Sequence, residues 1–324
     1  MSSGEFELIA RYLAPLAEGE AGALGLTDDA AALTPPPGST LVVTADAMVE
    51  GVHFLPDDPP ELVARKLLRV NLSDLAAMGA APWRYFICSA LTTGTGDEWS
   101  ERFAAGLADD QREFGVVLAG GDTVSTPGPK CFSLTALGLI EGGTAVRRSG
   151  ARPGDRLYVT GTIGDAALGL KVLQGEIEAG AGAAEKLAGR YRLPQPRVAA
   201  GPRLVGIATA MLDVSDGLLA DLGHICETSQ VSATVRAADV PLSTSALGLL
   251  ERDASLAGAI LGGGDDYELL FAAPPDRAAD VADVAREAGH AITEIGTIGE
   301  GEGIEVVDAE GVPVVITRRG WTHF

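Results

Sequence analysis

Aspartates recur at the ends of apolar segments in this sequence, and this repetition restricts the architecture more than any other feature. The five stretches that end in this way carry Asp28 with Asp29, Asp46, Asp74, Asp122, and Asp213 with Asp216. A dry interior does not accept so many unpaired carboxylates, and bringing them together without cations would cost strong repulsion. If the stretches converge, they therefore predict a site that holds several divalent ions.

The stretch from Val42 to Phe54 is rich in β-branched residues and carries the second of these aspartates. A strand over residues 41–46 would point Thr44 and Asp46 to the same face, because side chains alternate along a strand. A hydroxyl and a carboxylate in this arrangement suit a hard cation such as Mg²⁺. Taken alone, the stretch fits a hydrogen-bonded strand end equally well.

Asp74 lies in an apolar segment, residues 59–78, whose spacing predicts a long helix. A buried carboxylate is costly unless it is paired or bound to a metal, so this position favours a ligand role. Asp28 and Asp29 instead precede a proline-rich break. Standing alone, this pair would indicate a solvated turn or a helix cap.

Glycines precede aspartate at two further points. Gly120 and Gly121 separate Asp122 from a predicted strand over residues 116–119, and paired glycines let a backbone approach a phosphate closely. The same three residues also make a common turn. Residues 261–271 repeat the pattern as a glycine loop, two acidic residues and a strand.

A buried strand predicted over residues 210–213 leads into Asp213, Ser215 and Asp216 at the start of a helix. Either of the last two could cap that helix, but two carboxylates and a hydroxyl within four residues exceed what a cap requires.

Arg147 and Arg148 form a basic pair in front of a Pro-Gly turn. A guanidinium group suits bidentate phosphate contact, although a solvated linker explains the pair equally well. The composition changes here, and we place a domain boundary between residues 148 and 149.

Composition limits the partners. With 324 residues, 46% of them hydrophobic, the chain can bury substantial cores, and its length favours two domains. The net charge of −21 argues against nucleic acid. Three separated cysteines predict small buried thiols in a reducing compartment. Without a basic leader or a long apolar run, we expect a cytoplasmic protein with no membrane segment.

Several metals beside glycine turns are typical of phosphoryl transfer. The sequence contains neither the Gly-x-x-x-x-Gly-Lys-Ser/Thr loop nor the His-Arg-Asp set of protein kinases. The alternative of a different class is a non-catalytic, acidic scaffold whose aspartates hold structural ions. The glycine turns favour an enzyme, because a structural ion needs no open approach for phosphates.

The chain also resembles the thiamine-monophosphate kinases of the aminoimidazole ribonucleotide synthetase superfamily, over essentially its whole length. The motifs that carry the resemblance are residues 50–54 (Glu-Gly-Val-His-Phe), 71–79 (Asn-Leu-Ser-Asp-Leu-Ala-Ala-Met-Gly), 120–123 (Gly-Gly-Asp-Thr), 213–218 (Asp-Val-Ser-Asp-Gly-Leu) and 266–269 (Asp-Tyr-Glu-Leu).

The resemblance implies two α+β domains with mixed sheets packed against helices, here residues 1–148 and 149–324. The first would hold the metal and ATP site and a sheet that pairs in a homodimer, and the second would close over the active site. The implied reaction is ATP-dependent phosphorylation of thiamine monophosphate with several Mg²⁺ ions. A related superfamily member that uses ATP to activate an amide or carbamoyl group is the alternative.

The resemblance also assigns roles to individual residues. The implied Mg²⁺ ligands are Asp29, Thr44, Asp46, Asp74, Asp122, Asp213 and Asp216. The implied ATP contacts are Gly121, Asp122, Arg148 and Ser215. The implied substrate contacts are His53, Asp265 and Trp321. No residue is expected to act as a general base, and the metal cluster and Arg148 would assist transfer.

This sequence departs from the family pattern at two points, and both affect the roles that the resemblance assigns. Asp265 stands where the family usually has glutamate, so the substrate-facing acid is one methylene shorter. Leu26 and Thr27 precede the early aspartate pair where a glycine is usual.

Overall fold

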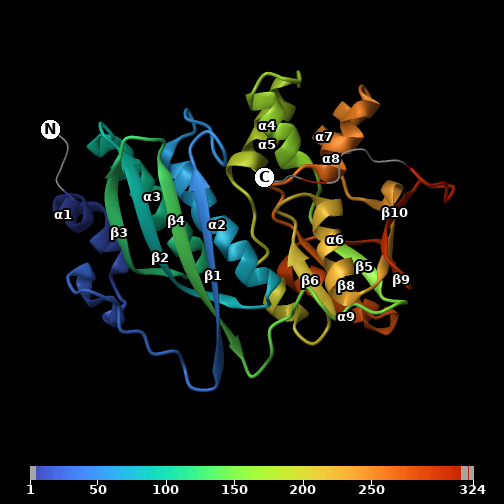
Figure 1. Cartoon of the computed structure of the whole chain (residues 1–324), viewed down its shortest axis with the longest axis horizontal. Helices are drawn as coiled ribbons and strands as arrows, with labels where there is room; N and C mark the ends of the chain where they lie inside the picture. Colours follow the sequence, from blue (N-terminus) through green and yellow to red (C-terminus); the bar gives the residue numbers. More distant parts are fainter. Residues whose placement is uncertain (1–4, 315–319, 321–324) are drawn as a thin grey trace. The chain divides into compact units, whose positions relative to one another are not determined.

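The structure, a computed structural model, describes residues 5–314 and residue 320 (Figure 1). The chain divides into two compact units. Unit 1 takes in the described residues up to Leu75 together with Ala80–Gly143, and unit 2 takes in Ala76–Gly79 together with the described residues from Thr144 onward. Within this part of the chain, no helix combines the length and apolarity needed to cross a membrane.

Unit 1 begins with short helical turns and continues as a four-stranded sheet with two long helices. Its elements are α1 (Glu5–Leu8), a π-helical turn (Ile9–Leu13), 3₁₀ turns (Ala14–Ala17 and Ala21–Leu26), β1 (Ser39–Val49), α2 (Pro60–Ala77), β2 (Ala81–Thr92), α3 (Asp97–Phe114), β3 (Val117–Thr126) and β4 (Cys131–Glu141).

The sheet of unit 1 has the order β1-β4-β2-β3, so β1 and β3 form its two edges. The β1/β4 and β4/β2 pairs are antiparallel, and β2/β3 is parallel. One face is buried against the helices, as Phe132 shows by stacking on Phe103 of α3 with 4.9 Å between ring centroids. The other face exposes large apolar side chains of both edge strands: Leu41 (41%), Val43 (57%) and Val124 (52%).

Unit 2 contains a six-stranded sheet, with the order β10-β7-β9-β5-β8-β6, and its helices. Its elements are β5 (Arg156–Thr160), α4 (Asp165–Leu173), α5 (Ala181–Arg192), β6 (Ala210–Asp213), α6 (Leu218–Ser229), β7 (Ser232–Arg236), α7 (Thr244–Leu250), α8 (Ala257–Gly262), β8 (Leu269–Ala273), α9 (Ala278–Ala288), β9 (Ile292–Gly299) and β10 (Gly303–Val307), with 3₁₀ turns at Gly201–Leu204, Ala237–Asp239, Ala254–Leu256 and Pro275–Arg277.

Both faces of the sheet in unit 2 are buried. Leu157 and Val159 of β5 join a core with α4, α6, α7 and α8, while Tyr158 faces a second core with α9. This explains why β5, β6 and β8 are continuous apolar runs rather than alternating ones. Mixed sheets packed against helices confirm the predicted α+β class.

Three local predictions were wrong. The helical spacing of Phe6, Ile9, Leu13 and Leu16 predicts an amphipathic helix over residues 5–18. The segment is instead a succession of α, π and 3₁₀ turns, because Pro15 has no N–H group for a continuous α-helix. An aspartate at the start of an amphipathic segment predicts Asp97 as the N-cap of α3, but the N-cap is Gly96 and Asp97 is the first residue of the helix. Of the cysteines expected to be buried, Cys226 is buried but Cys88 is exposed and Cys131 is half-buried.

Candidate active site

Thr44, Asp46 and Asp74 are brought together where β1 meets α2. The Thr44 hydroxyl donates to Asp74 Oδ2 at 2.5 Å. The backbone N–H of Asp46 donates to Asn71 Oδ1 at 3.2 Å, and Asn71 lies one helical turn before Asp74. The predicted common face of Thr44 and Asp46 agrees with the burial pattern of β1, in which both are less exposed than Val43, Ala45 and Ala47. Hydroxyl and carboxylate oxygens gathered in this way fit a hard cation such as Mg²⁺.

His53 follows β1, and hydrogen bonds fix both its ring and its backbone. Val49 N–H donates to His53 Nδ1 at 3.1 Å, and the buried Lys66 Nζ donates to the His53 carbonyl at 3.0 Å. A neutral imidazole whose Nδ1 accepts a bond carries its proton on Nε2. His53 therefore offers a donor, which suits an anionic ligand better than it suits proton abstraction.

Asp29 and Asp122 are exposed. The Asp29 N–H donates to Asp28 Oδ1 at 3.2 Å, and the Thr123 N–H donates to Asp122 Oδ1 at 2.8 Å. Gly121 is required sterically, since a Cβ there would lie 1.9 Å from the Ile87 carbonyl oxygen.

Asp122 does not lie beside Asp46 within one sheet. Asp46 is on edge strand β1 and Asp122 is on edge strand β3, with β4 and β2 between them. Three inter-strand spacings amount to about 14 Å, which is too far for one ion to bridge two carboxylates.

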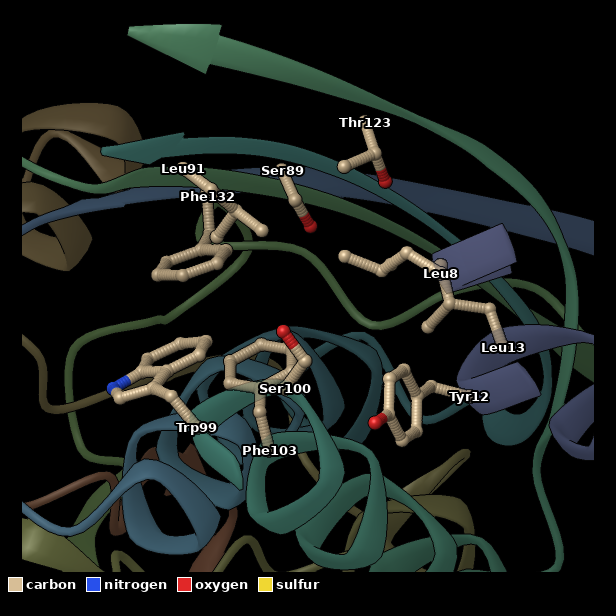
Figure 2. Close-up of a pocket in the computed structure, with 10 residues that line it drawn as sticks. All are labelled: Leu8, Tyr12, Leu13, Ser89, Leu91, Trp99, Ser100, Phe103, Thr123 and Phe132. Carbon is tan, nitrogen blue, oxygen red and sulfur yellow. The ribbon is translucent and has the colours of Figure 1, made fainter. Parts of the chain in front are cut away.

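A pocket beside Thr123 lies between the sheet, α3 and the opening helical turns (Figure 2). Trp99 stacks on Phe103 and on Phe132, with ring centroids 5.0 and 6.0 Å apart. The hydroxyls of Tyr12 and Thr123 are buried at this pocket without a hydrogen-bond partner among the described residues. Buried hydroxyls normally have partners, so the pocket combines an apolar wall with unused polar groups. Sequence reasoning missed this pocket; its only signal was the Trp99–Phe103 face of α3.

In unit 2, the backbone N–H groups of residues 215–217 converge on one carboxylate, that of Asp221. Asp213 ends β6 and is buried, whereas Ser215 and Asp216 are half-buried. The Asp221 side chain accepts hydrogen bonds from this segment. Burial and the charge of Asp216 raise the pKa of Asp221 to about 7, against the lowering effect of backbone donors and Arg148.

Asp265 lies directly beside that segment. Its N–H donates to the Ser215 carbonyl at 2.9 Å, and the Tyr267 N–H donates to the Val214 carbonyl at 2.8 Å. The structure thus places the proposed substrate acid next to the proposed ATP-binding serine. Arg148 is exposed, and its carbonyl accepts from Ser229 Oγ at 3.4 Å. Trp321 lies outside the described residues.

The proposed metal ligands are divided between the units. Asp29, Thr44, Asp46, Asp74 and Asp122 belong to unit 1, and Asp213 and Asp216 belong to unit 2. Within residues 5–314, no group of three acidic, histidine or cysteine side chains is gathered closely enough to hold an ion. The ligand set therefore remains a prediction, supported by the oxygen donors around Asp74.

Comparison with known proteins identifies the family. Residues 27–140 match the family described as AIR synthase related protein, N-terminal domain, and residues 152–309 match the corresponding C-terminal domain. Thiamine-monophosphate kinase of Caulobacter vibrioides is 45% identical over 322 residues, which cover 98% of this chain and 90% of that protein. The Escherichia coli K12 enzyme of the same name is 40% identical over 100% of this chain and 99% of its own length.

Solved structures agree. Thiamine-monophosphate kinase from Stenotrophomonas maltophilia has a TM-score of 0.85 at 40% identity, covering 97% of this chain and 99% of that chain. A structure described as AaThiL complexed with AMPPCP and TMP has a TM-score of 0.79 at 32% identity, covering 99% of this chain and 97% of that chain. The chain therefore belongs to the thiamine-monophosphate kinase family of AIR synthase related proteins.

Proposed function

We propose that this chain transfers the γ-phosphoryl group of ATP to the phosphate of thiamine monophosphate, forming thiamine diphosphate. The observation that carries the proposal is the full-length similarity to AaThiL, whose structure contains AMPPCP and TMP, an ATP analogue and thiamine monophosphate. The local geometry supports it, because the Asp265 N–H donates to the Ser215 carbonyl. A proposed substrate contact and a proposed ATP contact are therefore neighbours.

The predicted ligands Asp29, Thr44, Asp46, Asp74, Asp122, Asp213 and Asp216 would hold Mg²⁺. When bound, Mg²⁺ would neutralise charge on the phosphates during transfer. Arg148 would contact the phosphates through its guanidinium group. His53 would donate Nε2–H to a phosphate oxygen of the substrate, since Nδ1 accepts from Val49.

The reaction needs no protein general base. The nucleophile is an oxygen of the substrate's own phosphate, whose second pKa is about 6, so it is largely ionised at neutral pH. The protein's task is then to hold two anionic groups in line for transfer. The donor tautomer of His53 agrees with this assignment.

The pocket beside Thr123 has a cavity volume of about 20 Å³, which suits a water molecule or a small polar group rather than the nucleobase of ATP. The hydroxyls of Tyr12 and Thr123 would supply hydrogen bonds to that group.

We further propose a homodimer in which the open sheet faces of two copies meet. Leu41, Val43 and Val124 are exposed on this face and on its edges, and an apolar sheet face of this kind is typical of an interface. A twofold arrangement that places β3 of one copy beside β1 of the other would close both edges. It would also bring the edge strand that carries Asp122 of one copy beside the edge strand that carries Asp46 of its partner.

The test is direct. Incubation with ATP, Mg²⁺ and thiamine monophosphate, followed by ³¹P NMR, should yield ADP and thiamine diphosphate in equal amounts. Thiamine, which lacks the acceptor phosphate, is the matched control and should not be phosphorylated. Hydrolysis of ATP to ADP without thiamine diphosphate would reject the proposal and favour activation of another acceptor.

A further inference from the structure

A single buried carboxylate organises the loop that carries Ser215 and Asp216. Asp221 lies in the first turn of α6 with only 2% of its surface exposed. Its Oδ2 accepts hydrogen bonds from three consecutive N–H groups, those of Ser215, Asp216 and Gly217, each at 3.0 Å. Consecutive N–H groups that converge on one point form an anion-binding nest, and here the nest is filled by the chain's own side chain.

The filled nest has a chemical consequence for ATP. The N–H groups of residues 215–217 already bond to Asp221, so they are not available to cradle a phosphate. Any phosphate held at this loop must be bound by side chains or by cations they ligate. This loop therefore works differently from a glycine-rich phosphate loop, although it also stands between a strand and a helix.

The same loop supports the segment that carries Asp265. The Ser215 carbonyl accepts from Asp265 N–H, and the Val214 carbonyl accepts from Tyr267 N–H. Asp265 and Tyr267 adopt left-handed backbone conformations, with φ of 69° and 52°. Residues other than glycine rarely adopt such conformations unless the surroundings impose them. The carbonyl groups of the Asp221-held loop are part of those surroundings.

Close packing leaves little room for the two segments to move independently. A Cβ at Gly264 would lie 2.2 Å from the Ser215 carbonyl oxygen, and one at Gly217 would lie 2.8 Å from the Gly262 carbonyl carbon. A shift of residues 215–217 therefore displaces residues 262–265.

We propose that Asp221 is a positioning residue that fixes Ser215 and Asp216 and, through the Ser215 carbonyl, Asp265. One carboxylate then sets the ATP-facing and substrate-facing groups of unit 2 together. This inference deepens the proposed function and rests on it for the identity of the two ligands.

Kinetics of Asp221→Ala and Asp221→Asn test the proposal. Asp221→Ala should raise the KM for ATP and the KM for thiamine monophosphate together, each by about tenfold or more, since the acceptor of three amide hydrogen bonds is lost. Asp221→Asn, which retains an acceptor oxygen, should recover part of both losses. Asp155→Asn is the matched control, because Asp155 is also buried and accepts from Arg152 N–H and Thr209 at the opposite end of β6.

Amide hydrogen exchange on the unliganded protein separates this inference from the proposed function. In Asp221→Ala, the amides of residues 215–217 should exchange faster, and those of Asp265 and Tyr267 should follow, while Asp155→Asn leaves all five unchanged. If Asp221→Ala changes the exchange rates as expected but the wild type forms no thiamine diphosphate, the proposed function fails and the positioning role stands. If Asp221→Ala lowers Tm as Asp155→Asn does and changes neither KM nor the Asp265 amide, the positioning role is overturned.

Discussion

At the residue scale, the proposed chemistry depends on carboxylates that hydrogen bonds orient. The Thr44 hydroxyl orients Asp74, and the Thr123 N–H orients Asp122. The two elements around Asp74 are fixed by bonds of their own, such as Asn71 Nδ2 to the Leu67 carbonyl at 2.9 Å. An oriented ligand loses little freedom when a cation binds, so charge rather than geometry becomes the property to test.

Asp74→Asn should abolish turnover while the fold is retained. The substitution keeps the size and an acceptor for Thr44 but removes one ligand charge. The loss should exceed the roughly 10- to 100-fold cost of removing an outer-sphere partner, and it should be measured as kcat at saturating Mg²⁺ alongside Tm.

Asp109→Asn is the control for Asp74→Asn, because Asp109 is an exposed acid on α3 that pairs only with Arg112 among the ion pairs of the described chain. It removes the same charge and should leave kcat unchanged. Near-normal turnover of Asp74→Asn would remove Asp74 from the ligand set.

His290 should make unit 2 less stable as the pH falls. Burial and the nearby Arg197 lower the pKa of His290 below its ordinary 6.5, and its Nδ1 lies 3.3 Å from Arg197 Nη1. As pH falls through about 6.5, the unfolded chain takes up a proton that the folded chain refuses, so stability decreases until the folded pKa is reached.

His290→Asn retains an acceptor for Arg197 but cannot titrate. Urea unfolding at about pH 8 and pH 5 should show a smaller stability loss for this variant than for the wild type. Equal losses in both proteins would assign the pH dependence to other groups.

At the scale of elements, sequence periodicity predicted which side chains share a face of a strand but not which helix packs against that face. Alternation along β1 predicted the common face of Thr44 and Asp46, yet nothing in it indicated that Asp74, thirty positions later, would accept from Thr44. Period identifies which side is buried, whereas the helix that covers it depends on chain topology. No local sequence pattern indicated the left-handed conformation of Tyr267. Its N–H donates to the Val214 carbonyl, which belongs to a loop far away in the sequence.

Thr123→Val should not destabilise the fold. The buried Thr123 hydroxyl has no partner in the described chain, so replacing it with a methyl group should leave Tm unchanged or raise it. Differential scanning calorimetry of wild type and variant measures the change in Tm.

Thr160→Val, in β5 of unit 2, is the matched substitution at a buried strand threonine, whose hydroxyl donates to Glu268 and accepts from the Leu269 N–H, and it should lower Tm. A Thr123→Val protein that loses as much Tm as Thr160→Val would show that the Thr123 hydroxyl has a hydrogen-bond partner in solution.

At the scale of the whole molecule, the sheet of one copy keeps two of the proposed metal ligands apart. The sequence predicted both Asp46 and Asp122 as ligands, but strand order places them on opposite edges of one sheet. Local sequence patterns carry no information on which edge strands meet across a dimer, since that contact depends on the exposed face and the backbone of the edge. The proposed dimer would explain both the open apolar face and the divided ligand set, because it would form a site shared by two copies.

Mixed dimers test this explanation. Asp46→Asn and Asp122→Asn should each be inactive alone, but refolding equal amounts together should restore about a quarter of wild-type activity, since random pairing makes half of the dimers mixed and each mixed dimer has one intact site of two. Asp46→Asn mixed with Asp74→Asn is the control, because both residues lie where β1 meets α2 of the same copy and no pairing restores a site. Recovery in the first mixture and none in the second would require Asp122 to act across the interface. An inactive first mixture would confine the site to one chain, and another role would then have to be found for the open face.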